Sequence, residues 1–149
     1  MSDDHPSLQE YFSEDHRRCD ACWAEVEGAA ESGSAADVKT AWQRFEAAQR
    51  RHLRMEEEVI FPAFERATGM TGGGPTFVMR AEHDQMRGLL EQMGEAAEAG
   101  ELDALVDLGD TLLMLIQQHN QKEEHMLYPM SSDALAAEWD ALYARVSQM

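Results

Sequence analysis

Apolar residues recur along this chain at alternating steps of three and four positions, the spacing of one face of an α-helix. Four segments show the pattern, at about 8–30, 38–63, 79–97 and 105–130. The stretches between them carry glycine, serine and threonine, which predicts connections between helices. Strand-like alternation is absent from the sequence, so the pattern predicts an all-α protein.

A fifth, shorter helix is predicted at about 132–147, on the expectation that Pro129 ends the fourth helix. Its apolar stripe consists of Leu135, Trp139, Leu142 and Val146. This helix could cap the bundle or meet a second copy of the chain in a homodimer. The length of 149 residues fits one domain, with the helical bundle at about 7–130.

The sequence contains an internal repeat with an offset of 67 residues. Residues 52–62 read HLRMEEEVIFP, and residues 119–129 read HNQKEEHMLYP. Without a gap, the same offset relates His16 to His83, Gly33 to Gly100, Glu56 to Glu123, Glu57 to Glu124 and Pro62 to Pro129. Two similar helical hairpins predict an up-down-up-down four-helix bundle with approximate two-fold symmetry.

Several polar residues interrupt the apolar faces of these helices. His52 and Glu56 lie one helical turn apart, as do their repeat equivalents, so each pair projects from one face. Burying an unpaired carboxylate costs several kcal/mol in practice. Arg87 is the main arginine near the stripes that could offset this cost. A pair of metal ions would offset it better.

The predicted metal-binding residues are four histidines and two glutamates. They are His16, His52, Glu56, His83, His119 and Glu123. Imidazole and carboxylate ligands suit divalent ions such as iron, although manganese and zinc stay open. The repeat predicts one ion in each half, with both glutamates bridging. A structural zinc site would prefer four ligands rich in cysteine. Surface His–Glu pairs or satisfied core histidines are the alternative without metal.

The remaining candidate residues have simpler interpretations. Cys19 and Cys22 form a CxxC motif within a helix, where a disulfide would be strained, so both are predicted as reduced thiols. A redox role near the metal is the alternative for Cys19. His5 and His125 are not expected to be ligands. Glu57 and Glu58 are predicted to face solvent or to contact the ligands.

The net charge of −17 argues against nucleic acid or an anionic membrane as a partner. No apolar run approaches the roughly 20 residues of a membrane-spanning helix. The first residues, MSDDHPSLQE, are acidic and polar, which is not typical of a signal peptide. The expected location is the cytoplasm.

Taken together, His16, "HLRMEEEVIFP", "AEHDQMR" and "HNQKEEHMLYP" resemble the hemerythrin-like (HHE cation-binding) family over roughly residues 7–130. The resemblance implies a non-haem di-iron centre in a four-helix bundle, with the six predicted metal-binding residues as ligands. An oxo or hydroxo bridge would complete the pair of iron ions. The resemblance also implies dioxygen, nitric oxide or peroxide as the small molecule.

Two positions differ from the oxygen-carrying members of that family. Arg87 stands where they place a fifth histidine, and Glu123 follows His119 by four residues where they take a carboxylate at five, here Glu124. The four-residue spacing resembles a bacterial group linked to repair of iron–sulfur centres under nitrosative stress.

The leading functional prediction is a di-iron protein that binds dioxygen or nitric oxide, in oxidative or nitrosative stress response, sensing or iron handling. A peroxidase-like or nitric-oxide-reducing enzyme and an iron–sulfur-centre repair protein are the alternatives, so enzymatic activity is left open. A third alternative is a purely structural module whose last helix binds another chain.

Overall fold

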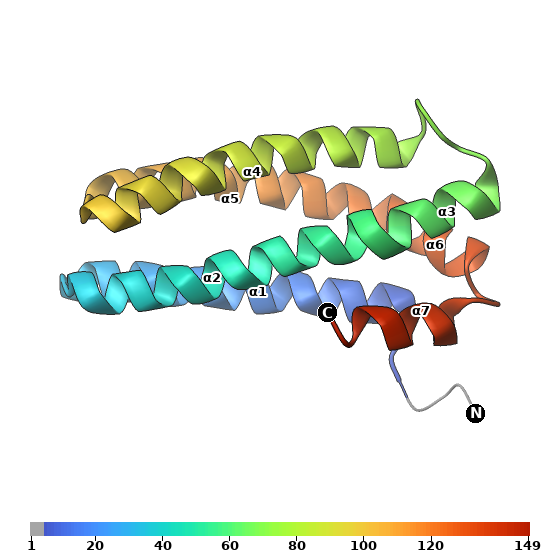
Figure 1. Ribbon diagram of the computed structural model, residues 1–149, viewed down its shortest axis with the longest axis horizontal. Coiled ribbons are helices and arrows are strands. Elements are labelled where there is room, and N and C mark those ends of the chain that lie inside the picture. Colours follow the sequence, from blue (N-terminus) through green and yellow to red (C-terminus); the bar gives the residue numbers. More distant parts are fainter. Residues whose placement is uncertain (1–4) are drawn as a thin grey trace.

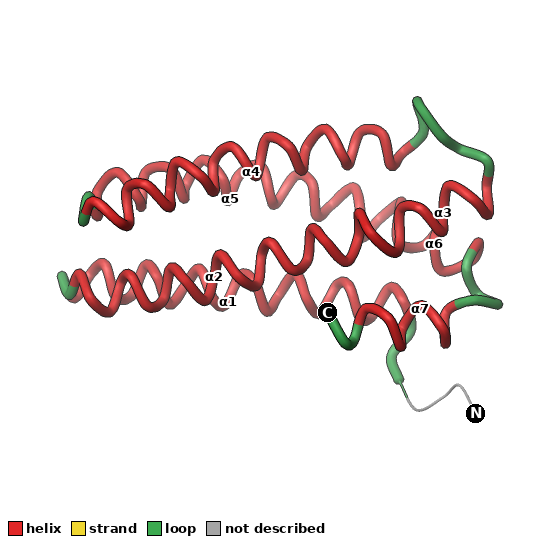
Figure 2. Tube along the Cα trace, in the orientation of Figure 1, coloured by secondary structure: helices red, strands yellow, loops and turns green. Residues whose placement is uncertain are grey.

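The computed structural model describes residues 5–149, and within that range the secondary structure is entirely helical (Figure 1, Figure 2). The elements are α1 (Leu8–Ser32), α2 (Ala35–Met55), η2 (Glu56–Ile60), α3 (Phe61–Thr68), α4 (Pro75–Ala99), α5 (Leu102–Lys122), η3 (Glu123–Leu127), α6 (Tyr128–Ala134) and α7 (Trp139–Val146). The expected all-α class is confirmed for this range.

Two helical hairpins make up the bundle, with α1 against α2 and α4 against α5. Their tight turns lie at the same end of the molecule, the left end in Figure 1. Gly33 and Gly100 end the first helix of each hairpin with positive φ angles of 78° and 72°, which a glycine adopts without steric cost. These two glycines are repeat equivalents, so the repeat includes the turns.

A π-helical turn begins at the glutamate of the His-x-x-x-Glu sequence in each hairpin. In η2 and η3 the backbone closes i→i+5 hydrogen bonds, so Phe61 N–H donates to Glu56 O and Tyr128 N–H donates to Glu123 O. The prolines then occupy the first turn of α3 and α6, where their missing N–H is tolerated. The expectation that Pro129 ends the fourth helix is therefore wrong.

The π turn in η3 also changes which residues face the core. A regular α-helical spacing places Met126 on the buried face, but its side chain is 47% exposed. Leu127 and Tyr128 are buried instead. One extra residue per turn rotates the following positions around the helix axis, which explains the difference.

The C-terminal helix is shorter than predicted. In place of one helix at 132–147, residues up to Ala134 belong to α6, a turn follows, and α7 begins at Trp139. The helix packs on its own chain against α1 and η2, where Trp139, Leu142 and Val146 join a buried apolar cluster. The Trp139 indole N–H donates a hydrogen bond to Pro6 O at 2.9 Å.

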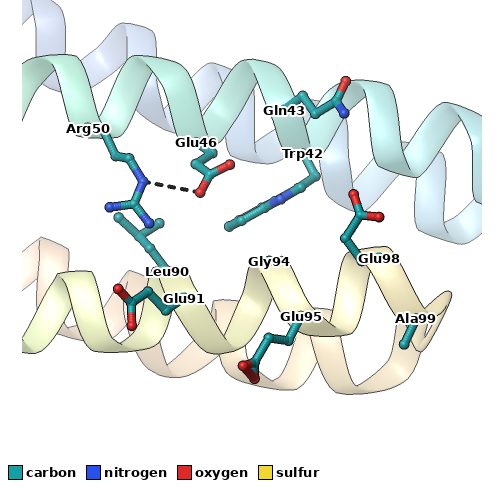
Figure 3. A pocket seen from close by; sticks show the side chains of 10 residues that line it. All are labelled: Trp42, Gln43, Glu46, Arg50, Leu90, Glu91, Gly94, Glu95, Glu98 and Ala99. Atoms are coloured by element: carbon teal, nitrogen blue, oxygen red, sulfur yellow. Dashed lines mark hydrogen bonds and ion pairs between the residues drawn. The ribbon is translucent and has the colours of Figure 1, made fainter.

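A groove of about 810 Å³ runs between α2 and α4 (Figure 3). Trp42 and Leu90 form its floor, and acidic side chains such as Glu95 and Glu98 line its edges. None of the six predicted metal-binding residues lines this groove. Among residues 5–149, no helix has the length and apolar character needed to cross a membrane.

Candidate metal centre

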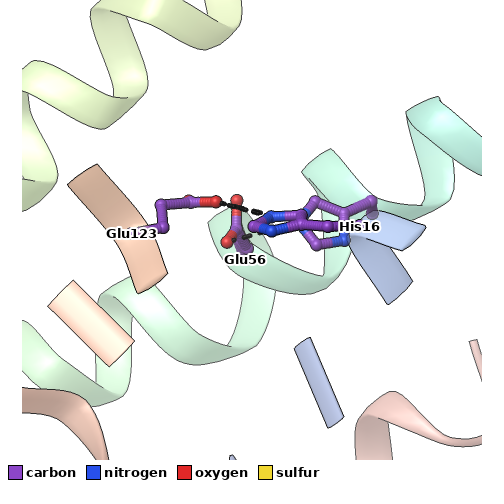
Figure 4. A group of neighbouring side chains, drawn as sticks. His16, Glu56 and Glu123 are labelled. Carbon is purple, nitrogen blue, oxygen red and sulfur yellow. Dashed lines mark hydrogen bonds and ion pairs between the residues drawn. The ribbon is translucent and has the colours of Figure 1, made fainter. Parts of the chain in front are cut away.

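The six predicted metal-binding residues lie together in the interior of the bundle, each at most 4% exposed. We call this set the His/Glu cluster. It divides into a first half with His16 and His52, and a second half with His83 and His119. Glu56 and Glu123 belong to both halves, and within each half the donor atoms lie within 4.8 Å of one another. Figure 4 shows both glutamates facing His16.

Each glutamate directs one oxygen to each half. In the first half, His16 Nε2 lies 2.9 Å from Glu123 Oε1, and His52 Nε2 lies 3.5 Å from Glu56 Oε2. In the second half, His83 Nε2 lies 3.0 Å from Glu56 Oε1. His119 Nε2 there lies 3.1 Å from Glu123 Oε2. This is the arrangement that two bridging carboxylates require.

All four histidines turn Nε2 toward the cluster and bond a carboxylate through Nδ1. The Nδ1 distances are 2.6 Å for His16–Glu124, 2.8 Å for His52–Asp15, 2.7 Å for His83–Glu57 and 2.8 Å for His119–Glu82. A proton held on Nδ1 fixes the tautomer that leaves Nε2 free as a metal ligand. The four carboxylates, which we call the outer carboxylates, are two repeat-related pairs offset by 67 residues.

Several surface cations pair with the outer carboxylates. Arg18 and Arg51 lie 3.0 and 3.7 Å from Asp15, Arg87 pairs with Glu57, and Lys122 pairs with Glu82. Arg87, the arginine that could have offset Glu56 and Glu123, does not pair with them, because its guanidinium reaches the outer carboxylate Glu57 behind His83.

Histidines are the charge partners of the two buried glutamates. Among the described residues, every ion-pair partner of Glu56 and Glu123 is a histidine. Burial disfavours a charged imidazole at His83, yet its ion pair with Glu56 and its hydrogen bond to Glu57 raise its pKa to about 9. Burial likewise disfavours the charged carboxylate of Glu123, but attraction to His119 holds its pKa well below the usual range.

The second half contains two buried oxygens that lack a hydrogen bond within the described chain. These are Glu56 Oε1 and Glu123 Oε2, although each lies close to a histidine Nε2. His83 Nε2 also faces His119 Nε2 at 3.2 Å, with ring nitrogens directed at each other. Two carboxylate oxygens without a hydrogen bond, beside two imidazole nitrogens that face each other, fit a divalent cation.

Comparison with protein-family models gives a match to the hemerythrin HHE cation-binding domain over residues 7–131. The chain belongs to the hemerythrin HHE cation-binding domain family. Domains of this family bind metal cations, typically iron, which agrees with the donor set of the His/Glu cluster. The resemblance drawn from the sequence motifs is therefore confirmed.

Several curated relatives of this hemerythrin domain carry the name iron-sulfur cluster repair protein YtfE. The protein from Yersinia pseudotuberculosis serotype IB (strain PB1/+) is 45% identical over 40 residues, which are 27% of this chain and 18% of that protein. The protein from Yersinia pestis (strain Pestoides F) is 48% identical over 33 residues, 22% of this chain and 15% of that protein. The similarity thus spans less than a fifth of these relatives. No solved structure matches the chain.

Tyr128 is a member of this hemerythrin site that the sequence motifs did not single out. Its side chain is fully buried, and its hydroxyl lies 2.6 Å from Glu56 Oε2 and 2.8 Å from Glu123 Oε1. Burial and the two carboxylates raise its pKa well above the usual value, so the metal-free chain holds a neutral phenol. The sequence feature that could have pointed to Tyr128 is the repeat, because the equivalent residue, Phe61, has no hydroxyl.

The other polar candidates lie outside the His/Glu cluster. Cys19 is buried and Cys22 is half-buried, and both thiols are free, as predicted. His125 and Glu58 are exposed. His5 lies at the C-terminal helix instead, 3.0 Å from Asp140 Oδ1.

Proposed function

We propose that this chain is a non-haem di-iron protein that binds a small diatomic molecule, dioxygen or nitric oxide, inside an up-down-up-down four-helix bundle. Each hairpin supplies two histidines and one glutamate, and both glutamates bridge the two ions. A role in oxidative or nitrosative stress response, sensing or iron handling follows from that ligand chemistry.

The observation that carries the proposal is the sharing of Glu56 and Glu123 between two buried histidine pairs. A single ion would use one oxygen of each glutamate and leave the other, in the protein interior, with only a histidine beside it. Two ions use all four oxygens and all four Nε2 atoms. Bound iron would supply an open coordination position and the redox chemistry for the small molecule.

The chain's own residues prepare this site in three ways. The outer carboxylates hold the imidazole rings in one orientation and one tautomer. The π turns set the direction of the chain just after each bridging glutamate. Apolar clusters on both sides of the His/Glu cluster exclude bulk water, which strengthens electrostatic interactions with a bound ligand.

Metal analysis of the chain purified from its own cells tests the proposal. We expect about two irons per chain, and optical spectra of the reduced protein that change on addition of dioxygen or nitric oxide. Glu58→Gln, at an exposed position beside the bridging glutamate, is the matched control for Glu56→Gln. A wild-type chain with fewer than about one metal ion would contradict the di-iron proposal.

Two further functions have specific support. The local similarity to proteins named for iron–sulfur cluster repair favours delivery of iron to such a centre. Arg87 stands outside the His/Glu cluster, so four histidines leave coordination open for turnover of peroxide or nitric oxide. Sustained consumption of either molecule would favour an enzyme, whereas a stable adduct favours binding. Restoration of a damaged iron–sulfur protein would favour repair.

A further inference from the structure

The hydroxyl of Tyr128 touches all four donor atoms of the first half. It lies 2.6 Å from Glu56 Oε2 and 2.8 Å from Glu123 Oε1. It also lies 3.0 Å from His16 Nε2 and 3.3 Å from His52 Nε2. The hydroxyl can donate one hydrogen bond and accept two, so hydrogen bonding alone does not account for all four contacts.

These distances match the spacing of neighbouring ligands around one metal ion. Ligands at right angles, each about 2.1 Å from a metal, lie about 3 Å apart, and opposite ligands lie about 4.2 Å apart. His16 Nε2 and Glu123 Oε1 are 2.9 Å apart, and His52 Nε2 lies 3.9 Å from the same oxygen. The four donors therefore lie at spacings that neighbouring and opposite ligands of one ion can have, and the Tyr128 hydroxyl lies within 3.3 Å of each of them.

The second half has no equivalent hydroxyl. Phe61 stands 67 residues before Tyr128, and its ring lies 5.4 Å from that of His83, while the Tyr128 ring lies 5.5 Å from that of His16. The two aromatic rings thus hold matching places in their hairpins. Tyr128 differs from Phe61 by its hydroxyl oxygen. The two glutamate oxygens that lack a hydrogen bond face the second half, beside Phe61.

We propose that the Tyr128 oxygen is a protein ligand of the metal ion held by His16 and His52. This inference rests on the proposed di-iron function. Five protein atoms would then hold the first ion, and Tyr128 would release its phenol proton to solvent when the ion binds. The second ion, at His83 and His119, keeps the open position for the small molecule.

A different arrangement would follow if the hydroxyl only fills the centre of the metal-free cluster. The phenol would then swing aside on metal binding and leave both ions alike. The two arrangements differ in the spectrum of the iron-loaded chain, because a phenolate bound to ferric iron gives a visible charge-transfer band and a phenol beside it does not.

The experiment compares three iron-loaded proteins: the wild type, Tyr128→Phe and the double variant Phe61→Tyr/Tyr128→Phe. We expect the charge-transfer band in the wild type, its loss in Tyr128→Phe and its return in the double variant, which moves the hydroxyl to the second half. Mössbauer spectra should show two distinct ferric sites in the wild type and more similar sites in Tyr128→Phe. Iron content and circular dichroism are measured on each sample.

Three results would overturn the Tyr128 assignment. A wild type that holds two irons but lacks the band overturns the Tyr128 assignment and leaves the di-iron function standing. A band that persists in Tyr128→Phe also overturns it, because the phenolate would then come from elsewhere. A folded wild type that binds no iron overturns both proposals.

Discussion

The Nδ1 atom of His16 lies 2.6 Å from Glu124 Oε2, and the repeat-equivalent pair, His83 and Glu57, is 2.7 Å apart. Both hydrogen bonds cross from one hairpin to the other, since His16 lies in α1 and Glu124 in η3. The other two outer carboxylates, Asp15 and Glu82, bond histidines within their own hairpins. The crossing pairs therefore connect the two hairpins at the metal centre.

Glu57→Gln should lower metal affinity by about 10–100-fold, because an amide fixes the imidazole of His83 less firmly than a carboxylate. Competition with a chelator of known affinity measures the change. Glu58→Gln removes the same charge one residue away on an exposed side chain and should leave affinity nearly unchanged. Equal losses in the two variants would show that net charge, and not the bond to His83, matters.

Substitution of a shared glutamate should reduce the number of bound metal ions more than substitution of a histidine. His83→Ala takes one ligand from the second half only, so about one metal ion per chain should remain. Glu123→Gln weakens both halves and should reduce binding of both ions. Metal analysis of each purified variant, with circular dichroism to check folding, gives the comparison. Equal metal content in the two variants would contradict the bridging arrangement.

The pKa of His83, raised from 6.5 to about 9, predicts how stability of the metal-free chain depends on pH. Below pH 6.5 the protonated side chain of His83 stabilises the folded chain fully. This stabilisation is lost as the pH rises to about 9. The melting temperature of the metal-free chain should therefore fall across this range. In the metal-loaded chain the fall should be smaller, because metal binding strengthens as competing protons leave.

Thermal melts of both forms at several pH values test this expectation. His83→Gln should flatten the alkaline fall of the metal-free chain, whereas the exposed His125→Gln should not. Parallel pH profiles for the metal-free and metal-loaded chains would argue against protons and metal ions competing for the same nitrogens.

The sequence predicted the positions of the His/Glu cluster because His-x-x-x-Glu is a local pattern. Four residues make one helical turn, so His52 and Glu56 share a face before any tertiary contact forms. The π turns were missed because regular helical spacing carries no signal for an extra residue, although that residue turns Met126 to solvent and buries Leu127 and Tyr128.

The side-chain contacts between neighbouring helices could not be predicted from the sequence pattern either. Asp15 and Glu82 precede the histidines of their own helices by one residue, yet each serves a histidine on the neighbouring helix. Tyr128 was overlooked because an aromatic residue before proline occurs in both repeats, and only the structure brings the hydroxyl to the cluster.

The most closely packed glycine lies outside the His/Glu cluster, where α1 meets α5. A Cβ atom added to Gly109 would lie 2.0 Å from Trp23 Cζ2, and the indole is 3% exposed, so it has little room to move. Gly109→Ala should therefore destabilise the fold by about 1–3 kcal/mol. Gly88→Ala, where nothing lies within 4 Å, should be neutral or stabilising by up to about 1 kcal/mol.

Urea unfolding of the metal-free chain measures both effects, and a double-mutant cycle identifies their cause. Leu90 is the repeat equivalent of Trp23, which makes Trp23→Leu a substitution that the repeat already uses. In that background Gly109→Ala should cost much less, because the ring that would clash is gone. An undiminished cost in the Trp23→Leu protein would show that Gly109 is required for its backbone and not for the close approach of the indole.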